Sequence, residues 1–246
     1  MNRTDTTPDA DLLVEVSAGV MTLTLNRPAA RNALNLSLVQ ALSAALKIFD
    51  ADPNCRVMIV TGTDPAFCAG LDLKDFSAPD SPRGLVAALL DEFPRRAKPV
   101  IGAINGTAVT GGLELALGCD FLIASERARF GDTHSKIGAL AGGGMNSRLP
   151  HAVGLRMAKQ LIYSCVPIDA VTALRIGLIN EVTPHEALLR RAREIAGSIA
   201  QNNPELIAIV KAVLDRGAEG TLEAAVELER EALRTRKARG AMSWKS

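Results

Sequence analysis

The sequence predicts an α/β fold with parallel strands, followed by an α-helical C-terminal section. Three short runs, at 57–62, 100–104 and 121–124, are almost wholly apolar, which is typical of strands buried on both faces of a sheet. Helix-like stretches at 84–93 and 112–117 lie between these runs, and this β-then-α rhythm indicates parallel strands joined by helices. After about residue 145 the strand signals fade and helical patterns take over.

A β-hairpin and a helix are predicted ahead of this rhythm. Residues 12–16 and 20–25 are strand-like runs, and Gly19 suits the turn between them. Further along, apolar residues recur at helical spacing, and Asn35 or Ser37 can cap the start of that helix. The apolar face of this helix consists of Leu38, Leu42, Ala45, Leu46 and Phe49.

The C-terminal section predicts one short strand at 178–182 and otherwise helices. The expected helices cover 154–163, 169–175, 185–201, 204–216 and 221–237. The last helices carry too few apolar residues to stand alone, so they should pack on the core or on another subunit. We therefore expect a flexible N-terminal tail at 1–11, an α/β core at 12–184 and a helical oligomerisation region at 185–246.

Length, composition and charge narrow the class of protein. With 246 residues, of which 48% are hydrophobic, the chain is long enough to bury a large core without disulfide or metal staples. The net charge of +1 and an aromatic content of 3% argue against partners such as nucleic acid or an anionic membrane surface. No window of about 20 apolar residues is free of charge, so we predict no membrane span.

The cysteines and histidines predict no redox or metal chemistry. The four cysteines include no C-x-x-C pair, and the N-terminus lacks an apolar stretch of signal-peptide type, so reduced thiols in the cytoplasm are expected. We interpret Cys68 as a small packing residue rather than a nucleophile. With three histidines in total, a metal cluster is improbable.

Two glycine-rich segments follow predicted buried strands. They are 67–73 and 105–116, and ligands usually bind at the C-terminal ends of such parallel strands. In the second segment Gly111 and Gly112 precede a helix, whose free N–H groups could stabilise an oxyanion. The spacing from Gly106 to Gly111 is that of a phosphate-binding loop, but the Lys and Ser/Thr that should follow are missing.

Segments 67–73 and 105–120 resemble the two signatures of the enoyl-CoA hydratase/isomerase (crotonase) superfamily. Further similar motifs occur in order at 26–34, 130–150 and 170–179, so the resemblance covers about residues 12 to 215. It implies a crotonase-like spiral of ββα units with a C-terminal α-helical trimerisation region. It also implies an acyl-CoA thioester as substrate, a homotrimer or dimer of trimers, and no cofactor, since coenzyme A is part of the substrate.

The resemblance also assigns residues to substrate binding. By position, Ala69 and Gly111 would present the two backbone N–H groups of an oxyanion hole, which stabilise the charge that an enolate places on the thioester oxygen. Candidate contacts to the acyl-CoA are Arg27, Arg31, Ala33, Gly70, Leu71, Asp72 and Lys74, although Asp72 is more typical of a cap. Trp244 and Lys245 weakly resemble an aromatic–basic pair that covers adenine in some members, and the loop at 76–84 is expected to shape the acyl pocket.

The acid–base pair is where this sequence departs from the family pattern. Glu114 matches one of the two glutamates that family hydratases use, whereas His134 occupies the position of the other. Hydration needs one group to activate water and one to deliver a proton, which a Glu–His pair could do with Asp132 behind the imidazole. His134 could instead be a structural loop residue paired with Asp132.

Three functions follow from this pair. The leading hypothesis is an enoyl-CoA hydratase, which adds water across the 2,3 double bond through an oxyanion-stabilised enolate. The second is an enoyl-CoA isomerase or other enolate chemistry with Glu114 as the sole carboxylate. The third is a weakly active or non-catalytic family member that binds acyl-CoA.

Overall fold

Two sheets of unequal size form the centre of the computed structural model, which describes residues 3–4, 10–78 and 80–240. The larger sheet has the order β1-β2-β3-β4-β6-β8-β11 and contains Arg3–Thr4, Leu12–Ser17, Val20–Leu25, Val57–Gly62, Val100–Ile104, Phe121–Ser125 and Glu181–Thr183. Strands β1 to β3 pair antiparallel, and β3 through β11 pair parallel, as the β-then-α rhythm predicted.

The smaller sheet has the order β10-β9-β7-β5 and was not predicted as strands. Its strands are Ala66–Cys68 (β5), Thr107–Val109 (β7), Arg129–Gly131 (β9) and Ile168–Asp169 (β10). Strands of two or three residues are too short to show an alternating pattern, so the sequence gives no strand signal for them. Because β5, β7 and β9 pair parallel, the segments that follow them leave the sheet at the same edge.

The expected spiral of ββα units is confirmed. The pairs β4–β5, β6–β7 and β8–β9 each place one strand in the larger sheet and the next in the smaller sheet. Each pair is followed by helical structure. The helices are α2 (Leu73–Phe76) and α3 (Arg83–Glu92), then α4 (Gly111–Leu117), then η3 (His134–Ile137) and α5 (Met145–Val153).

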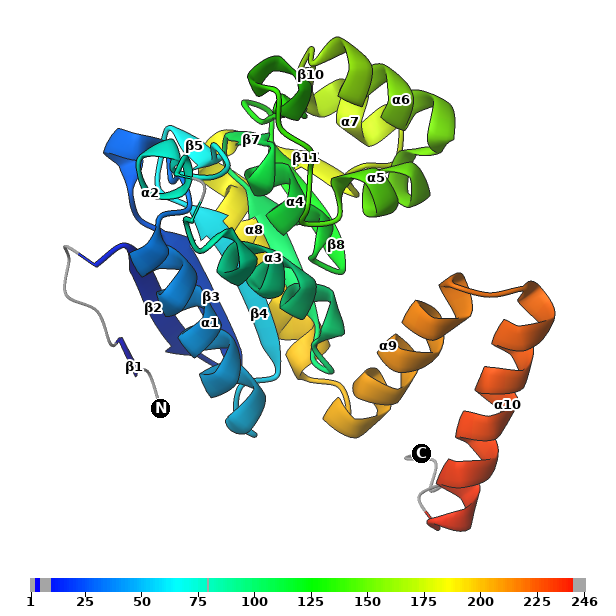
Figure 1. The fold of residues 1–246 in the computed structure, drawn as a ribbon. Coiled ribbons are helices and arrows are strands. Elements are labelled where there is room, and N and C mark those ends of the chain that lie inside the picture. Colours follow the sequence, from blue (N-terminus) through cyan, green and yellow to red (C-terminus); the bar gives the residue numbers. More distant parts are fainter. Residues whose placement is uncertain (1–2, 5–9, 79, 241–246) are drawn as a thin grey trace.

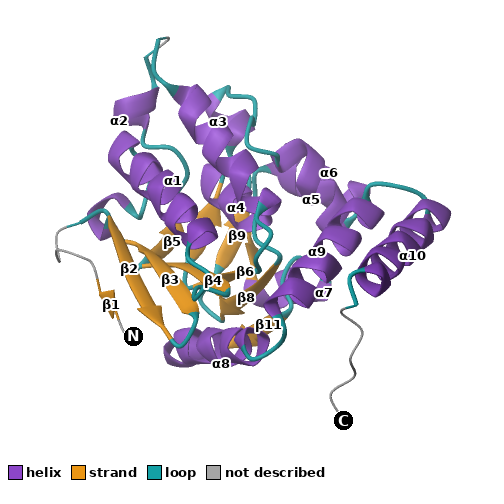
Figure 2. Cartoon of the chain, turned by 90° about the horizontal axis from the view of Figure 1, so that it is seen from below, coloured by secondary structure: helices purple, strands orange, loops and turns teal. Residues whose placement is uncertain are grey.

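The apolar strand runs are explained by helices on both faces of the larger sheet (Figure 2). Met58 and Val60 of β4 face a core shared with α1 (Leu36–Ala51), whose predicted apolar residues are all buried. Val57 and Ile59 face a second core, shared with α8 (Leu188–Ala200). Helix α1 begins after Asn35, whose side chain accepts a hydrogen bond from the N–H of Leu38 at 2.8 Å, so the cap is Asn35 and not Ser37.

The remaining helices include a pair that stands apart from the sheets. Helices α6 (Leu155–Ser164) and α7 (Ala170–Arg175) pack beside α5 and β10, and short 3-10 turns lie at Pro28–Ala30, Phe93–Arg95 and His185–Ala187. Helices α9 (Pro204–Ala218) and α10 (Leu222–Ala238) pack on each other to one side of the sheets (Figure 1), and neither contains a buried residue. Lys211 of α9 forms an ion pair with Asp120, which lies directly before β8. Among the described helices, none combines the length and apolar character that a bilayer crossing requires.

Three segment boundaries differ from the sequence analysis. The strand expected at 178–182 is β11 at Glu181–Thr183. Helix α8 falls inside the predicted 185–246 oligomerisation region, yet it packs on the larger sheet, so the part outside the core begins after α8. Within the predicted tail at 1–11, β1 pairs with β2.

Candidate active site

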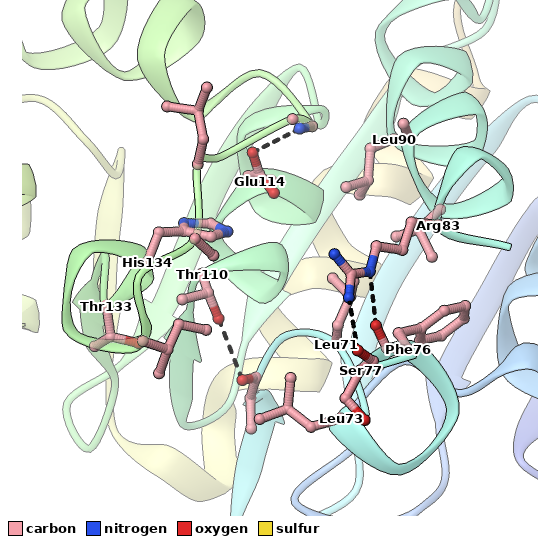
Figure 3. A pocket seen from close by; sticks show the side chains of 18 of the residues that line it. Leu71, Leu73, Phe76, Ser77, Arg83, Leu90, Thr110, Glu114, Thr133 and His134 are labelled. Atoms are coloured by element: carbon pink, nitrogen blue, oxygen red, sulfur yellow. Dashed lines mark hydrogen bonds between the residues drawn. The ribbon is translucent and has the colours of Figure 1, made fainter. Parts of the chain in front are cut away.

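A pocket of about 740 Å³ lies where the glycine-rich segments leave the smaller sheet. It is lined by residues around β5, α2, α3, the start of α4 and the segment from η3 to α5 (Figure 3). Most of its lining side chains are apolar. Three described lining residues are ionisable, namely Arg83, Glu114 and His134. An apolar pocket with a few converging polar groups is the usual form of a small-molecule site.

Glycines allow the two segments to touch. A β-carbon on Gly112 would lie 2.0 Å from the carbonyl oxygen of Cys68. Gly70 has a φ of +95°, and a β-carbon there would lie 2.1 Å from Oγ1 of Thr110. The Thr110 hydroxyl also donates to the carbonyl oxygen of Ala69 at 3.3 Å. A side chain at either glycine would therefore push the two segments apart.

The two predicted oxyanion donors lie in these touching segments. Gly111 is the first residue of α4, so its N–H has no acceptor within the helix. Its nitrogen lies close to the first segment, since a β-carbon on Gly70 would be 3.3 Å from the nitrogen of Gly111. Ala69 lines the pocket, but its N–H donates to the carbonyl oxygen of Arg31 at 3.1 Å. A thioester oxygen held by Ala69 would have to share or replace that bond.

Glu114 is a buried pocket residue. Its residue exposure is 2%, and Oε1 accepts hydrogen bonds from the N–H of Gly143 at 2.7 Å and from that of Met145 at 3.2 Å. Those two bonds hold the carboxylate in one orientation (Figure 3 draws the bond to Gly143) and leave Oε2 for a ligand. A surface role for Glu114 is therefore excluded.

His134 forms a close pair with Asp132. Nδ1 of the imidazole lies 2.5 Å from Oδ1 of Asp132, a residue that is 1% exposed and also accepts from the backbone N–H of His134 at 3.2 Å. This side-chain hydrogen bond raises the pKa of His134, while burial opposes the rise and the charges of Asp132 and Glu114 add to it. Since Nδ1 is engaged, Nε2 is the ring nitrogen left for a ligand.

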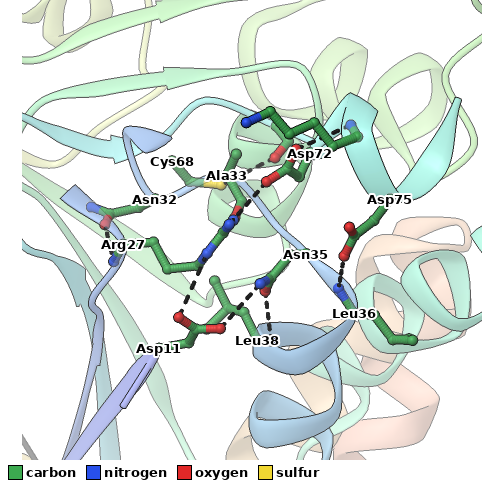
Figure 4. Close-up of polar contacts among 12 residues, drawn as sticks. Asp11, Arg27, Asn32, Ala33, Asn35, Leu36, Leu38, Cys68, Asp72 and Asp75 are labelled. Atoms are coloured by element: carbon green, nitrogen blue, oxygen red, sulfur yellow. Dashed lines mark hydrogen bonds and ion pairs between the residues drawn. The ribbon is translucent and has the colours of Figure 1, made fainter. Parts of the chain in front are cut away.

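Arg27 is held inside a polar cluster (Figure 4). Its guanidinium donates to the carbonyl oxygen of Ala33 at 2.5 Å and to Oδ2 of Asp72 at 2.9 Å, and it lies 3.6 Å from Asp11. Asp72 also caps α2 by accepting from the N–H of Lys74 at 3.1 Å, as its sequence position suggested. The contacts of Arg27 make it a tie between two loops rather than a free cation for a phosphate.

The other predicted substrate contacts divide between the pocket and the surface. Leu71 lines the pocket, whereas Arg31 and Lys74 are exposed. Ala33 and Gly70 are buried and belong to the contacts described above. Trp244 and Lys245 lie outside the described residues.

The pocket also contains residues that sequence reasoning did not single out individually. Gly143 lies within the motif stretch at 130–150, and its N–H donates a hydrogen bond to Oε1 of Glu114. Phe76, Arg83 and Leu90 line the opposite wall, where the loop at 76–84 and α3 meet. The sequence shows that residue 83 is an arginine, but it does not show that this side chain lies in the pocket wall.

Cys68 is buried beside the pocket, and that burial raises the pKa of its thiol to about 12. Such a thiol stays protonated and unreactive at neutral pH, which agrees with its interpretation as a packing residue. Cys55, Cys119 and Cys165 are also free. Within the described part of the chain, no group of three or more metal-ligating side chains gathers.

Comparison with known proteins shows the class to which this fold and pocket belong. The enoyl-CoA hydratase/isomerase family model matches residues 15–242, and the chain belongs to that family. It is 40% identical over 222 residues to a "Probable enoyl-CoA hydratase" of Rhizobium meliloti (strain 1021), with 89% of this chain and 86% of that protein covered.

Solved structures show the same fold. The crystal structure of an enoyl-CoA hydratase from Mycobacterium tuberculosis H37Rv has 46% identity and a TM-score of 0.78, covering 94% of this chain and 99% of that chain. An enoyl-CoA hydratase from Bacillus anthracis has 34% identity and a TM-score of 0.87, covering 91% and 90%. The expectation of a crotonase-like fold is confirmed.

Proposed function

We propose that this chain is an enoyl-CoA hydratase, which adds water across the 2,3 double bond of an enoyl-CoA thioester. One observation carries the proposal. The carboxylate of Glu114 and the imidazole of His134 line the same apolar pocket, beside the two segments that would hold the thioester. The names of the similar proteins described above support the same reaction.

The geometry suggests separate roles for the two side chains. Oε2 of Glu114 accepts a proton from water as the water oxygen bonds to carbon 3 of the acyl chain. The electrons of the double bond move toward the thioester oxygen, and Nε2 of His134 then delivers a proton to carbon 2. Asp132 holds the imidazole through Nδ1 and stabilises its protonated form.

The developing oxyanion is assigned to the N–H groups of Gly111 and Ala69. The position of Gly111 at the start of α4 supports this assignment, because the unpaired N–H groups of a helix N-terminus favour negative charge. For Ala69, the thioester oxygen would have to compete with the carbonyl oxygen of Arg31. No metal or redox cofactor is required by this scheme.

A second candidate function is the isomerisation of an enoyl-CoA double bond. Glu114 is the only carboxylate among the described lining residues, and one base can move a proton between carbons 2 and 4. In that reaction His134 would be structural. In the third alternative the same pocket binds acyl-CoA, but neither hydration nor isomerisation proceeds at a useful rate.

A steady-state assay decides among these functions. Loss of the conjugated thioester absorbance of crotonyl-CoA reports hydration, whereas its appearance from a 3-enoyl-CoA reports isomerisation. We expect Glu114→Gln to lower kcat for hydration by about 10²–10⁴ while butyryl-CoA still binds, because the change keeps the shape and removes the base. Glu126→Gln, on an exposed residue outside the pocket, is the control.

His134→Ala separates the first two functions. A fall in kcat of about 10²–10⁴ supports proton transfer by the imidazole. Unchanged hydration would make His134 structural. Isomerisation without hydration in the wild-type protein would instead favour the single-carboxylate alternative, and binding without either reaction would favour the third.

We also infer that α9 and α10 join copies of this chain as a homotrimer or a dimer of trimers. Neither helix has a buried residue, although Leu206, Val210 and Leu214 lie four residues apart on one face of α9. Apolar side chains in that arrangement gain stability when another surface covers them.

The four free thiols fit a reducing compartment, which supports a cytoplasmic location.

A further inference from the structure

Arg83 is the ionisable pocket residue that the hydration scheme does not use. Figure 3 shows it on the wall formed by α2 and α3, across the pocket from Glu114 and His134. We infer that Arg83 binds a carboxylate on the substrate, so that the preferred substrate is an enoyl-CoA whose acyl chain ends in a carboxylate. This inference rests on the proposed function for its reaction, but not for its binding site.

The guanidinium of Arg83 is held in place by the backbone. Nε donates to the carbonyl oxygen of Phe76 at 2.6 Å, and Nη2 donates to that of Ser77 at 3.1 Å. Both carbonyls lie at the C-terminal end of α2, where carbonyl oxygens have no acceptor role within the helix. The side chain is therefore oriented before any ligand arrives.

Two contacts leave most of the donors of this group unused. A guanidinium has five N–H donors, and Nε and Nη2 each use one here. The Nη1 hydrogens and the second Nη2 hydrogen remain, and the end of the fork can donate two hydrogen bonds to the two oxygens of a carboxylate. The contacts to Phe76 and Ser77 thus use one edge of the fork and leave the other for a ligand.

Arg83 has no anionic partner among the described residues. Its neighbours in the pocket wall include Phe76, Val86 and Leu90, which offer no charge. Arg83 is exposed at the pocket wall, so water and salt weaken its attraction for an anion, and the fixed fork has to supply the preference for a carboxylate.

The position of Arg83 relates its ligand to the acyl chain. Glu114 and His134 would act on carbons 2 and 3, next to the thioester held by the segments at 69–71 and 110–111. Arg83 lies on the other wall of the same pocket, so an acyl chain that fills the pocket can bring its far end to the guanidinium. Chain length decides whether the two ends reach both sites.

The test compares matched pairs of 2-enoyl-CoA substrates over a series of chain lengths, one ending in a carboxylate and one in a methyl group. We expect the wild-type protein to prefer the carboxylate at one chain length. Arg83→Gln should lower the ratio of the two kcat/KM values about tenfold, the effect of one charge-assisted hydrogen bond. Arg83→Lys keeps the charge but loses the fork, so its ratio of kcat/KM values should lie between those of the wild type and of Arg83→Gln.

Arg95→Gln is the control. Arg95 is exposed and does not line the pocket. Because this substitution removes the same charge outside the pocket, the ratio of the two kcat/KM values should stay at the wild-type value. Equal loss for both substrates in Arg83→Gln would overturn the inference, since a contact to the phosphates of coenzyme A or a purely structural tie would affect every acyl-CoA alike. A wild-type protein that shows no preference for the carboxylate at any length would also overturn it.

A binding measurement separates this inference from the proposed function. Calorimetry with saturated acyl-CoAs, with and without a terminal carboxylate, needs no turnover. Binding of the carboxylate form that weakens about tenfold in Arg83→Gln supports the subsite even if the protein hydrates nothing. Hydration of methyl-terminated substrates together with Arg83-independent binding would keep the function and reject the subsite.

Discussion

At the residue scale, the contact between Asp132 and His134 gives this site its own dependence on pH. A carboxylic acid and an imidazolium lose their protons in different pH ranges, with ordinary pKa values of about 4.3 for Glu and 6.5 for His. The hydrogen bond to Asp132 raises the pKa of His134 further. Such a proton donor keeps its proton to higher pH than a carboxyl group would.

This contact predicts the alkaline side of the activity profile. As pH rises through the raised pKa of His134, the imidazolium loses its proton and kcat should fall. Asp132→Asn removes the charge that favours the imidazolium, so the fall should begin at lower pH. The check is kcat against pH for both proteins, with Glu126→Gln as control; identical profiles would show that His134 is no proton donor.

The same pair should stabilise the fold in a pH-dependent way. Because the folded protein raises the pKa of His134, its contribution to stability is complete below the unfolded value of about 6.5. It is lost as pH rises through the raised native value. Thermal unfolding of the wild type and of Asp132→Asn at several pH values should therefore converge at alkaline pH.

Gly143 predicts how tightly the carboxylate of Glu114 must be positioned. A β-carbon on Gly143 would lie 2.8 Å from Oε2 of Glu114 and 2.2 Å from Cδ1 of Leu90. Gly143→Ala should therefore displace the carboxylate and reduce kcat by about 10²-fold, the usual cost of a misplaced catalytic group. In Gly142→Ala the added methyl group meets open space.

Steady-state kinetics of the two alanine variants checks this prediction. Gly142→Ala adds the same methyl group one residue away and should retain more of the wild-type kcat. Equal kcat values for the two variants would show that the position of Glu114 tolerates the shift.

At the element scale, the contact between β5 and the start of α4 joins the two glycine-rich segments. Gly112 lies against the backbone of Cys68, which cannot move aside as a flexible side chain could. The smaller sheet and α4 therefore depend on a missing side chain, and this contact also sets the distance between Ala69 and Gly111.

Gly112→Ala should destabilise the protein by about 1–3 kcal/mol, because the added carbon forces the two segments apart. Gly197→Ala, in the middle of α8, meets nothing within 4 Å and should stabilise the helix by up to about 1 kcal/mol. Urea unfolding of both variants measures these opposite signs. A neutral Gly112→Ala would mean that the contact relaxes easily.

At the scale of the whole molecule, α9 and α10 present apolar side chains that the single chain does not cover. Leu214 is 66% exposed, and its neighbours on the same face of α9 are also exposed. A helix pair with no buried residue gains little from the isolated fold. Assembly with other copies would supply the missing contacts.

Leu214→Arg should therefore lower the mass of the assembly. A charged side chain at the centre of an apolar interface loses its hydration without gaining a partner. The free energy that this costs is several times the free energy that burial of the leucine contributes. Ile48→Arg, on α1 and exposed to 60%, is the matched control and should leave the mass unchanged. Light scattering at micromolar concentration gives the mass, and a wild-type monomer would reject the proposed assembly.

The long elements and the family could be predicted from consecutive residues. Helix α1 and strands β4, β6 and β8 repeat their apolar residues over enough positions to reveal their period and burial. Glu114, His134 and Asp132 could be found by the spacing of motifs. The strands of the smaller sheet could not, because two or three residues do not establish a period.

The sequence by itself therefore determined the class of fold and the family, and it supplied the candidate residues of the site. Only the tertiary structure decided where those residues point. In the folded chain the guanidinium of Arg27 donates to Asp72, and the N–H of Ala69 donates to the carbonyl oxygen of Arg31. Arg83 lies in the pocket wall. The physical reason is that periodicity is written in neighbouring residues, whereas the direction and charge balance of a side chain depend on elements that meet only after the chain has packed.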